Sequence, residues 1–172
     1  MSETKKSSRN EKFVKFVMER ITQKDNGAVA ALKRANNPAT EYQSWEYLAR
    51  FVDIDKEYER LPFAAIGSAV AKAKVEQNGT VKIGQAIARC YVDGNQSDQA
   101  KAKLRRLLAC ETTEEVCRVL RPLFSLISSK GCISLDYVSL LDNLSYFNFN
   151  SQRVKSQWAQ DFYRHYELEE NV

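Results

Sequence analysis

The sequence predicts an all-α protein, a helical bundle of roughly eight helices in two packed sub-bundles. Apolar residues recur at spacings of three and four along most of the 172 residues, which is the period of a helix with one buried face. No alternating pattern of useful length indicates a strand. With 44% hydrophobic residues, only 3 prolines and 6 glycines, the chain can bury a core without disulfide or metal cross-links.

The N-terminal half divides into short helices at polar breaks. Residues 13–21 carry apolar side chains at helical spacing, and the Asp-Asn-Gly turn at 25–27 then caps a short alanine-rich helix. Residues 45–52 repeat the helical spacing in a third helix. Pro62 suits the first position of a fourth helix, which Asn-Gly at 78–79 ends, because the first turn of a helix does not need the N–H that proline lacks.

The C-terminal half has clearer boundaries. Residues 81–91 favour a short helix, although their β-branched start also fits a strand. Asp-Gly-Asn at 93–95 is the strongest break, and a capping box over 112–115 predicts the start of a helix. The remaining predicted boundaries are caps at Ser97 and Ser134, a stop at Lys130-Gly131, and a last cap at either Asn150 or Ser151.

We expect three segments along the chain: a frayed basic tail over residues 1–11, an N-terminal helical sub-bundle over 12–94, and a C-terminal helical sub-bundle over 95–172. The first residues are rich in Ser, Lys and Glu and contain no apolar run, so we expect neither a signal peptide nor a membrane anchor. No apolar stretch approaches the roughly 20 residues that span a bilayer. These features predict a cytoplasmic protein without membrane contact.

Residues that carry catalysis or bind metals are scarce. The one histidine, His165, has no partners for a metal site or a catalytic triad. The four cysteines form no CxxC pair and are expected to be free buried thiols, and neither a P-loop nor a dinucleotide-binding glycine motif is present. The carboxylate pairs Asp136 and Asp142, or Glu114 and Glu115, lie where helix capping or a solvated helix face explains them. We therefore predict a protein that is not an enzyme and has no cofactor, no metal and no small-molecule substrate.

Basic residues are concentrated in the middle of the chain. The net charge is only +4, but residues 72–106 contain eight basic and three acidic side chains. Arg105 and Arg106 occupy a helix face away from its leucines, and Arg118 and Arg121 lie three apart on the next helix. If these helices pack side by side, their charges form a ridge that follows phosphates without reading bases.

Two other functions fit part of the pattern. Residues 104–109 and 116–127 have the spacing of a helix-turn-helix DNA-binding regulator, but Glu114 and Glu115 would place carboxylates where a recognition helix meets DNA. A purely structural assembly subunit is the second alternative. The aromatic residues that could serve an interface there, or pack in the core, are Tyr146, Phe147 and Phe149.

An ordered set of fragments resembles the CasB small subunit of the type I-E CRISPR surveillance complex, Cascade. The resemblance runs from about Phe13 to Tyr166, and no single fragment is specific. The fragments are Gly27-Ala-Val-Ala-Ala-Leu-Lys-Arg34, Ile83-Gly-Gln-Ala-Ile-Ala-Arg89, Leu104-Arg-Arg-Leu-Leu108, Leu120-Arg-Pro-Leu123, Leu135-Asp-Tyr137, Leu140 to Leu144, and Val154 to Tyr163.

The resemblance implies an all-helical, catalytically inert subunit that takes part in antiviral defence. Its implied partners are other Cascade subunits, a second copy of itself, the CRISPR guide RNA, and target DNA including the displaced single strand of the R-loop. Because a displaced strand has arbitrary sequence, a protein that holds it needs contacts to the backbone rather than to the bases. This implication agrees with the basic ridge predicted from the residues.

The candidate nucleic-acid-binding residues come from two sources, with one further residue added. The matching fragments carry Lys33, Arg34, Arg105, Arg106, Arg121, Arg153 and Lys155. Charge clustering alone adds Lys72, Lys74 and Lys82. Arg118 is a further candidate that could instead belong to a protein interface.

Overall fold

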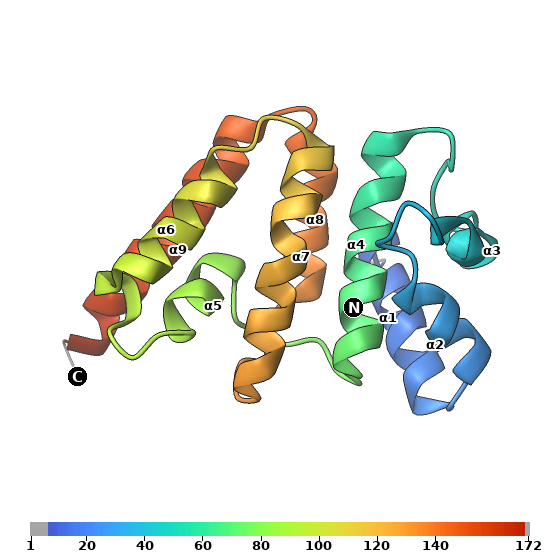
Figure 1. Ribbon diagram of the computed structural model, residues 1–172, viewed down its shortest axis with the longest axis horizontal. Helices are drawn as coiled ribbons and strands as arrows, with labels where there is room; N and C mark the ends of the chain where they lie inside the picture. The colour runs from blue at the N-terminus through green and yellow to red at the C-terminus, as the bar shows by residue number, and fades with distance from the viewer. Residues whose placement is uncertain (1–6, 171–172) are drawn as a thin grey trace, which may run out of the picture.

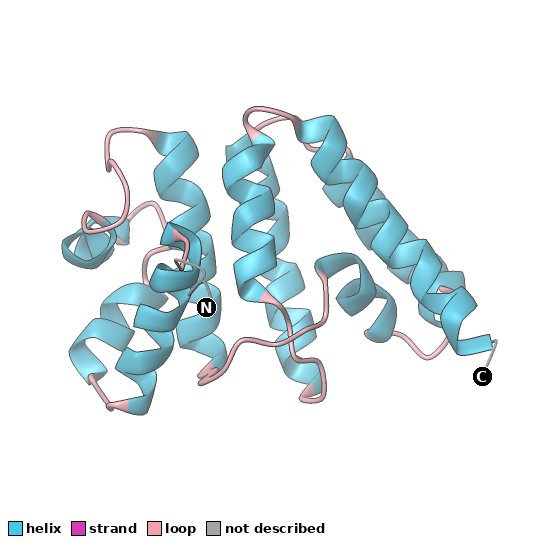
Figure 2. Ribbon diagram, turned by 180° about the vertical axis from the view of Figure 1, so that it is seen from behind, coloured by secondary structure: helices cyan, strands magenta, loops and turns pink. Residues whose placement is uncertain are grey.

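The computed structural model describes residues 7–170, with side chains up to residue 164. The all-α class is confirmed: the described residues form nine α-helices and two short 3-10 helices (Figures 1 and 2). The α-helices are α1 (Arg9–Thr22), α2 (Asn26–Lys33), α3 (Trp45–Leu48), α4 (Glu57–Ala73), α5 (Ile83–Arg89), α6 (Asp98–Leu108), α7 (Thr113–Lys130), α8 (Tyr137–Phe147) and α9 (Ser151–Glu170), with η1 (Glu41–Ser44) and η2 (Gly94–Gln96) between them.

The long helices stand in two layers. In Figure 1 α6 and α7 lie in front of α9 and α8, and α4 continues the front row beside α7. The short helices α2 and α3 cover the N-terminal end, whereas α5 fills the space between the α6–α9 pair and the α7–α8 pair (Figure 1). The front row therefore brings the helices with most of the predicted basic residues onto one face.

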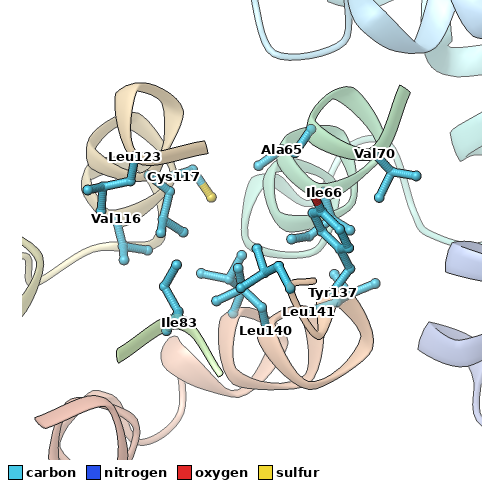
Figure 3. Packing of buried hydrophobic residues seen from close by; sticks show 14 of the residues in the cluster. Ala65, Ile66, Val70, Ile83, Val116, Cys117, Leu123, Tyr137, Leu140 and Leu141 are labelled. Atoms are coloured by element: carbon cyan, nitrogen blue, oxygen red, sulfur yellow. The ribbon is translucent and has the colours of Figure 1, made fainter. Parts of the chain in front are cut away.

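Helix α4 is the centre of the core. It packs against α1, α2, α7 and α8, and every residue from Pro62 to Ala71 is buried. Figure 3 shows its Ile66 facing Leu140 and Leu141 of α8, with side chains of α7 alongside. Helices from both sides of residue 94 thus share one hydrophobic cluster. The division into two sub-bundles at that residue stays a prediction.

Most predicted caps are confirmed because short polar side chains satisfy first-turn N–H groups. Asp25, Ser97 and Thr112 each accept a hydrogen bond from the third residue of the following helix. Gly131 ends α7 with a positive φ of 70°, a conformation that costs glycine little. Of the two alternatives for α9, Asn150 accepts from the Arg153 N–H at 3.1 Å.

The boundaries predicted for the N-terminal helices were partly wrong. Helix α4 begins at Glu57, so Pro62 lies inside it, and it ends at Ala73 because Lys74 turns left-handed with a φ of 54°. The helix predicted over 45–52 is a single turn preceded by η1. Tertiary packing overrides local signals here, since ten consecutive residues of α4 are buried by neighbouring helices.

The start of α8 also differs from its prediction. Asp136, not Ser134, caps the helix by accepting from the Ser139 N–H at 3.0 Å. The residues before it are extended, and Leu135 forms an isolated parallel bridge with Val81. The β-branched start of 81–91 therefore does pair as a strand would, while its remainder is the helix α5 that was predicted.

The segment expected as a frayed tail, residues 1–11, includes the start of a helix. Helix α1 begins at Arg9, whose guanidinium lies 3.6 Å from the Glu59 carboxylate and 5.2 Å from the ring centre of Phe63. Residues 1–6 lie outside the described part of the chain, as does the side chain of His165. In the described residues no helix is long and apolar enough to cross a membrane.

The cysteines and the late aromatic residues divide between core and surface. Three cysteines are free and buried as expected, but Cys132 is exposed. Phe147 is buried and stacks on Trp158, whereas Tyr146 is 44% exposed and Phe149 70% exposed. Of the two roles open to these aromatic residues, core packing therefore applies to Phe147 alone.

Candidate nucleic-acid interface

Helix α7 lies between α6 and α4 in the front row of Figure 1 and shares one groove with each of them. Its apolar stripe is buried against α4, α5 and α6, which leaves Arg118 and Arg121 exposed. Arg118 lines the groove shared with α6, and Arg121 lines the groove shared with α4. Two arginines three residues apart on one helix therefore line different grooves.

The α6–α7 groove has a volume of about 400 Å³. Lys103 and Arg106 enter it from α6, beside the face whose Leu104 and Leu107 are buried in the core. The groove contains Arg118 from α7 and one carboxylate, Glu115. Three cations against one anion leave a net positive cavity.

The α4–α7 groove is smaller, about 290 Å³, and more polar. Lys72 and Arg121 reach it from opposite walls, and hydroxyls of Ser125 and Ser128 also line it. The Arg121 guanidinium donates to the main-chain oxygen of Asn36, which fixes the arginine at the rim. Since a guanidinium has five N–H donors, most remain available to an anion.

The end of α2 adds two cations beside this second groove. The Ser68 hydroxyl donates to the main-chain oxygen of Lys33 at 2.9 Å and so ties α2 to α4. Arg34 follows Lys33 at the helix C-cap, where the helix dipole favours cations, and donates to the Gln43 side chain at 2.9 Å. Both predicted residues therefore lie within three positions of Asn36, whose main-chain oxygen accepts from Arg121.

The other predicted residues lie apart from the two grooves. Lys82 donates to the Asp136 carboxylate at 2.6 Å and thereby links α5 to α8. Arg153 lines a third groove, with Asp142 and Tyr146, between α8 and α9. The Lys155 amine lies 6.0 Å from the ring centre of Phe147.

Arg105 and Lys74 are exposed but line neither groove. Arg105 lies in the last turn of α6, next to Arg106, and Lys74 is the left-handed residue that ends α4. Neither residue is part of a groove wall. The basic residues that were predicted to form a single ridge are therefore distributed over two grooves and positions outside them.

Two groups in the α6–α7 groove have shifted pKa values. The Glu111 N–H donates to the Glu115 carboxylate at 2.8 Å and lowers the pKa of Glu115, which is therefore ionised at neutral pH. Burial raises the pKa of the Cys110 thiol, which donates to the main-chain oxygen of Arg106 and stays neutral. The groove thus keeps one negative charge, at its end beside the α6–α7 loop.

Lys103 and the serines of the second groove were not among the candidate residues predicted from the sequence, although Lys103 was counted in the basic segment 72–106. Lys103 precedes Arg106 by three residues on the same helix face, a spacing that was visible in the sequence. The serines gave no such signal, because only the packing of α4 on α7 places Ser68 and Ser128 in one groove. The described residues contain no group of three or more histidine, cysteine or acidic side chains that could hold a metal ion.

These observations describe a small all-helical protein with a basic, grooved face. The family model of the CRISPR-associated protein Cse2 matches residues 28–163. This chain therefore belongs to the Cse2 family. A sequence search among curated proteins finds no significant match.

Solved structures share the fold. CasB from M. ruber is 23% identical with a TM-score of 0.75, over 96% of this chain and 98% of that one. A chain of a CRISPR RNA-guided surveillance complex is 21% identical with a TM-score of 0.77, over 95% and 96%. A Cse2-family protein from Thermus thermophilus is 20% identical with a TM-score of 0.75, over 92% and 99%.

Proposed function

We propose that this chain is the non-catalytic small subunit of a type I-E CRISPR surveillance complex, Cascade. In that complex it binds the sugar-phosphate backbones of guide RNA and target DNA and holds the displaced strand of the R-loop. Membership of the Cse2 family and the likeness to a chain of a surveillance complex support the assembly. The two basic grooves on either side of α7 are the observation that carries the binding function.

Backbone binding suits the chemistry of these grooves. Lysine and arginine side chains neutralise phosphates and release condensed counterions, which gives affinity without sequence preference. Opening an R-loop exchanges one duplex for another of similar stability, so a few phosphate contacts to the extruded strand shift the balance toward the open state. Other Cascade subunits and a second copy of this chain are the proposed protein partners.

Removing groove charges tests the proposal. We expect the triple variant Lys72→Gln, Arg106→Gln, Arg121→Gln to bind labelled single-stranded DNA of scrambled sequence more weakly, because each residue lines a groove. The slope of log affinity against log salt should become shallower by about 2, since each lost contact to a single strand contributes roughly 0.7. Fluorescence anisotropy across a salt series measures both quantities.

A matched control removes three charges elsewhere. Lys12, Lys15 and Lys24 are exposed, on or just after α1, and line neither groove. Their replacement by glutamine makes the same change in net charge. Equal losses in the two triple variants would refute a localised interface and leave only the general attraction of a basic protein.

The helix-turn-helix alternative is less compatible with the grooves. The first turn of α7, which a recognition helix presents to DNA, contains Glu114 and Glu115. Arg118 lies 4.0 Å from the Glu114 carboxylate, so part of its charge is also offset there. The structural alternative relies instead on the exposed Tyr146 and Phe149. It predicts that the groove variant binds DNA as well as wild type.

A further inference from the structure

The α6–α7 groove has an apolar wall in addition to its cations. Val119 is half-buried, Leu123 is buried and Pro122 is exposed, and all three line the groove from α7. A phosphate gains nothing from aliphatic carbon, because an ion loses hydration there without finding a partner. This wall therefore indicates a ligand that is both anionic and partly apolar.

The order of the side chains along the groove follows from its topology. Helices α6 and α7 are joined by the short loop 109–112 and separate from each other away from it (Figure 1). Glu115 lies nearest that loop on α7, Arg118 and Val119 are one turn further, and Pro122 a further turn. Lys103 and Arg106 run in the opposite direction on α6. The carboxylate is thus at the closed end, and the apolar wall and Lys103 are toward the open end.

We propose that this groove receives a nucleobase turned out of a single strand, while Lys103, Arg106 and Arg118 hold its flanking phosphates. This inference rests on the proposed function and specifies its ligand as unpaired rather than duplex nucleic acid. A nucleotide combines a flat, largely apolar ring with an adjacent anion, which matches the wall and the rim. A base within a duplex cannot enter, because it is paired and stacked.

The α4–α7 groove provides an internal contrast. Its lining includes Lys72, Arg121 and the exposed serines Ser125 and Ser128, whose hydroxyls could donate hydrogen bonds to phosphate oxygens. We assign this groove to backbone alone. On this assignment the α4–α7 groove binds phosphates only, and the α6–α7 groove binds phosphates and a base.

Glu115 fits this arrangement because of its position. Its ionised carboxylate repels phosphates from the closed end, so the backbone lies toward Lys103 and the base points inward. The neutral thiol of Cys110 adds no charge against the ring. The groove has a volume of about 400 Å³, so a base bound in it would leave room for water at the rim.

The test compares two strands of equal length and charge. One is oligothymidine, and the other is a sugar-phosphate strand of abasic residues. We expect the full chain to bind oligothymidine about fivefold more tightly, because burying roughly 40 Å² of apolar surface against the aliphatic wall contributes about that factor. In Val119→Asn this preference should fall below twofold while the salt slope stays unchanged, since no phosphate contact is lost.

A second variant protects the test against misfolding. Pro122 is exposed, so Pro122→Asn leaves the core intact and should also lower the preference for the intact strand. Ser128→Asn in the other groove is the control and should leave the preference unchanged.

The outcomes separate the two proposals. Equal binding of both strands, with a steep salt slope, would overturn the base site and leave the backbone function standing. A preference that survives both groove variants would also overturn it. No binding of either strand at low salt would overturn the proposed function and the base site together.

Discussion

Helices α4 and α6 lie in the same front row but differ in how many of their residues the neighbouring helices bury. Helix α4 packs against α1, α2, α7 and α8, and buries an unbroken run of ten residues. Helix α6 contacts α5, α7, α9 and η2 and buries only Ala100, Leu104 and Leu107. Charged residues occur along α6 because one of its faces meets solvent, whereas α4 has no solvated face between Pro62 and Ala71.

This contrast indicates where substitutions should act. A residue enclosed on all sides contributes to stability through packing, and its loss leaves a cavity. A residue on a solvated face contributes little to stability and is free to serve binding. The following changes test that separation, beginning with the largest expected loss.

The Ile66→Ala variant in α4 should lower the free energy of unfolding by about 2–5 kcal/mol, because Ile66 is fully buried and its deletion leaves a cavity among α4 and α8 (Figure 3). Urea denaturation measures the loss. Lys72→Ala on the same helix is the control, and its effect should stay within about 0.5 kcal/mol. Similar losses for both would show that α4 is not the enclosed centre.

The Gly84→Ala variant in α5 should cost about 1–3 kcal/mol through overpacking. An added Cβ would lie 2.3 Å from the Trp158 main-chain oxygen and 2.7 Å from the Phe162 nitrogen, so α5 and α9 would have to separate. Gly27→Ala is the matched control, since the nearest atom to its added Cβ is 3.9 Å away. Thermal melts should place Gly84→Ala below wild type and Gly27→Ala at or above it.

The Asp136→Ala variant removes the cap of α8 and should cost about 1–2 kcal/mol. Burial alone would raise the pKa of Asp136, but hydrogen bonds from Lys82, the Ser139 N–H and Asn78 outweigh it, so the folded pKa is below its ordinary value. The stabilisation is therefore present above the ordinary pKa, near 4, and disappears as pH falls through the folded value.

Denaturation of the Asp136→Ala variant at several pH values checks this sign. The difference between wild type and variant should be constant near neutrality and shrink below about pH 4. Asp93→Ala serves as control, because Asp93 makes no side-chain capping bond. A difference that grew on acidification would contradict the assignment.

The Arg105→Gln variant in α6 should have the smallest effect, a loss of no more than about 0.5 kcal/mol. Arg105 is exposed in the last turn, where only the helix dipole favours its charge. Chemical denaturation in low salt measures the change. A loss above about 2 kcal/mol would mean that α6 packs this face against something and would remove the contrast with α4.

Many residues of the candidate site could be predicted from the sequence, but their arrangement in space could not. The spacing of Arg118 and Arg121 placed both on the exposed side of α7, and the capping box located the start of that helix. That they face different grooves depends on α6 and α4 packing on opposite sides. The ion pair of Lys82 with Asp136 joins residues 54 apart in sequence, so no local pattern could reveal it.

The amino-acid sequence alone was enough to predict the helical class, most caps and the excess of basic residues, because apolar period, capping side chains and charge are local properties of the chain. The packing of the helices sets where α4 begins, which aromatic residues are exposed, and how the cations divide between two grooves. These features depend on which helices become neighbours, and that choice rests on contacts between residues far apart in sequence.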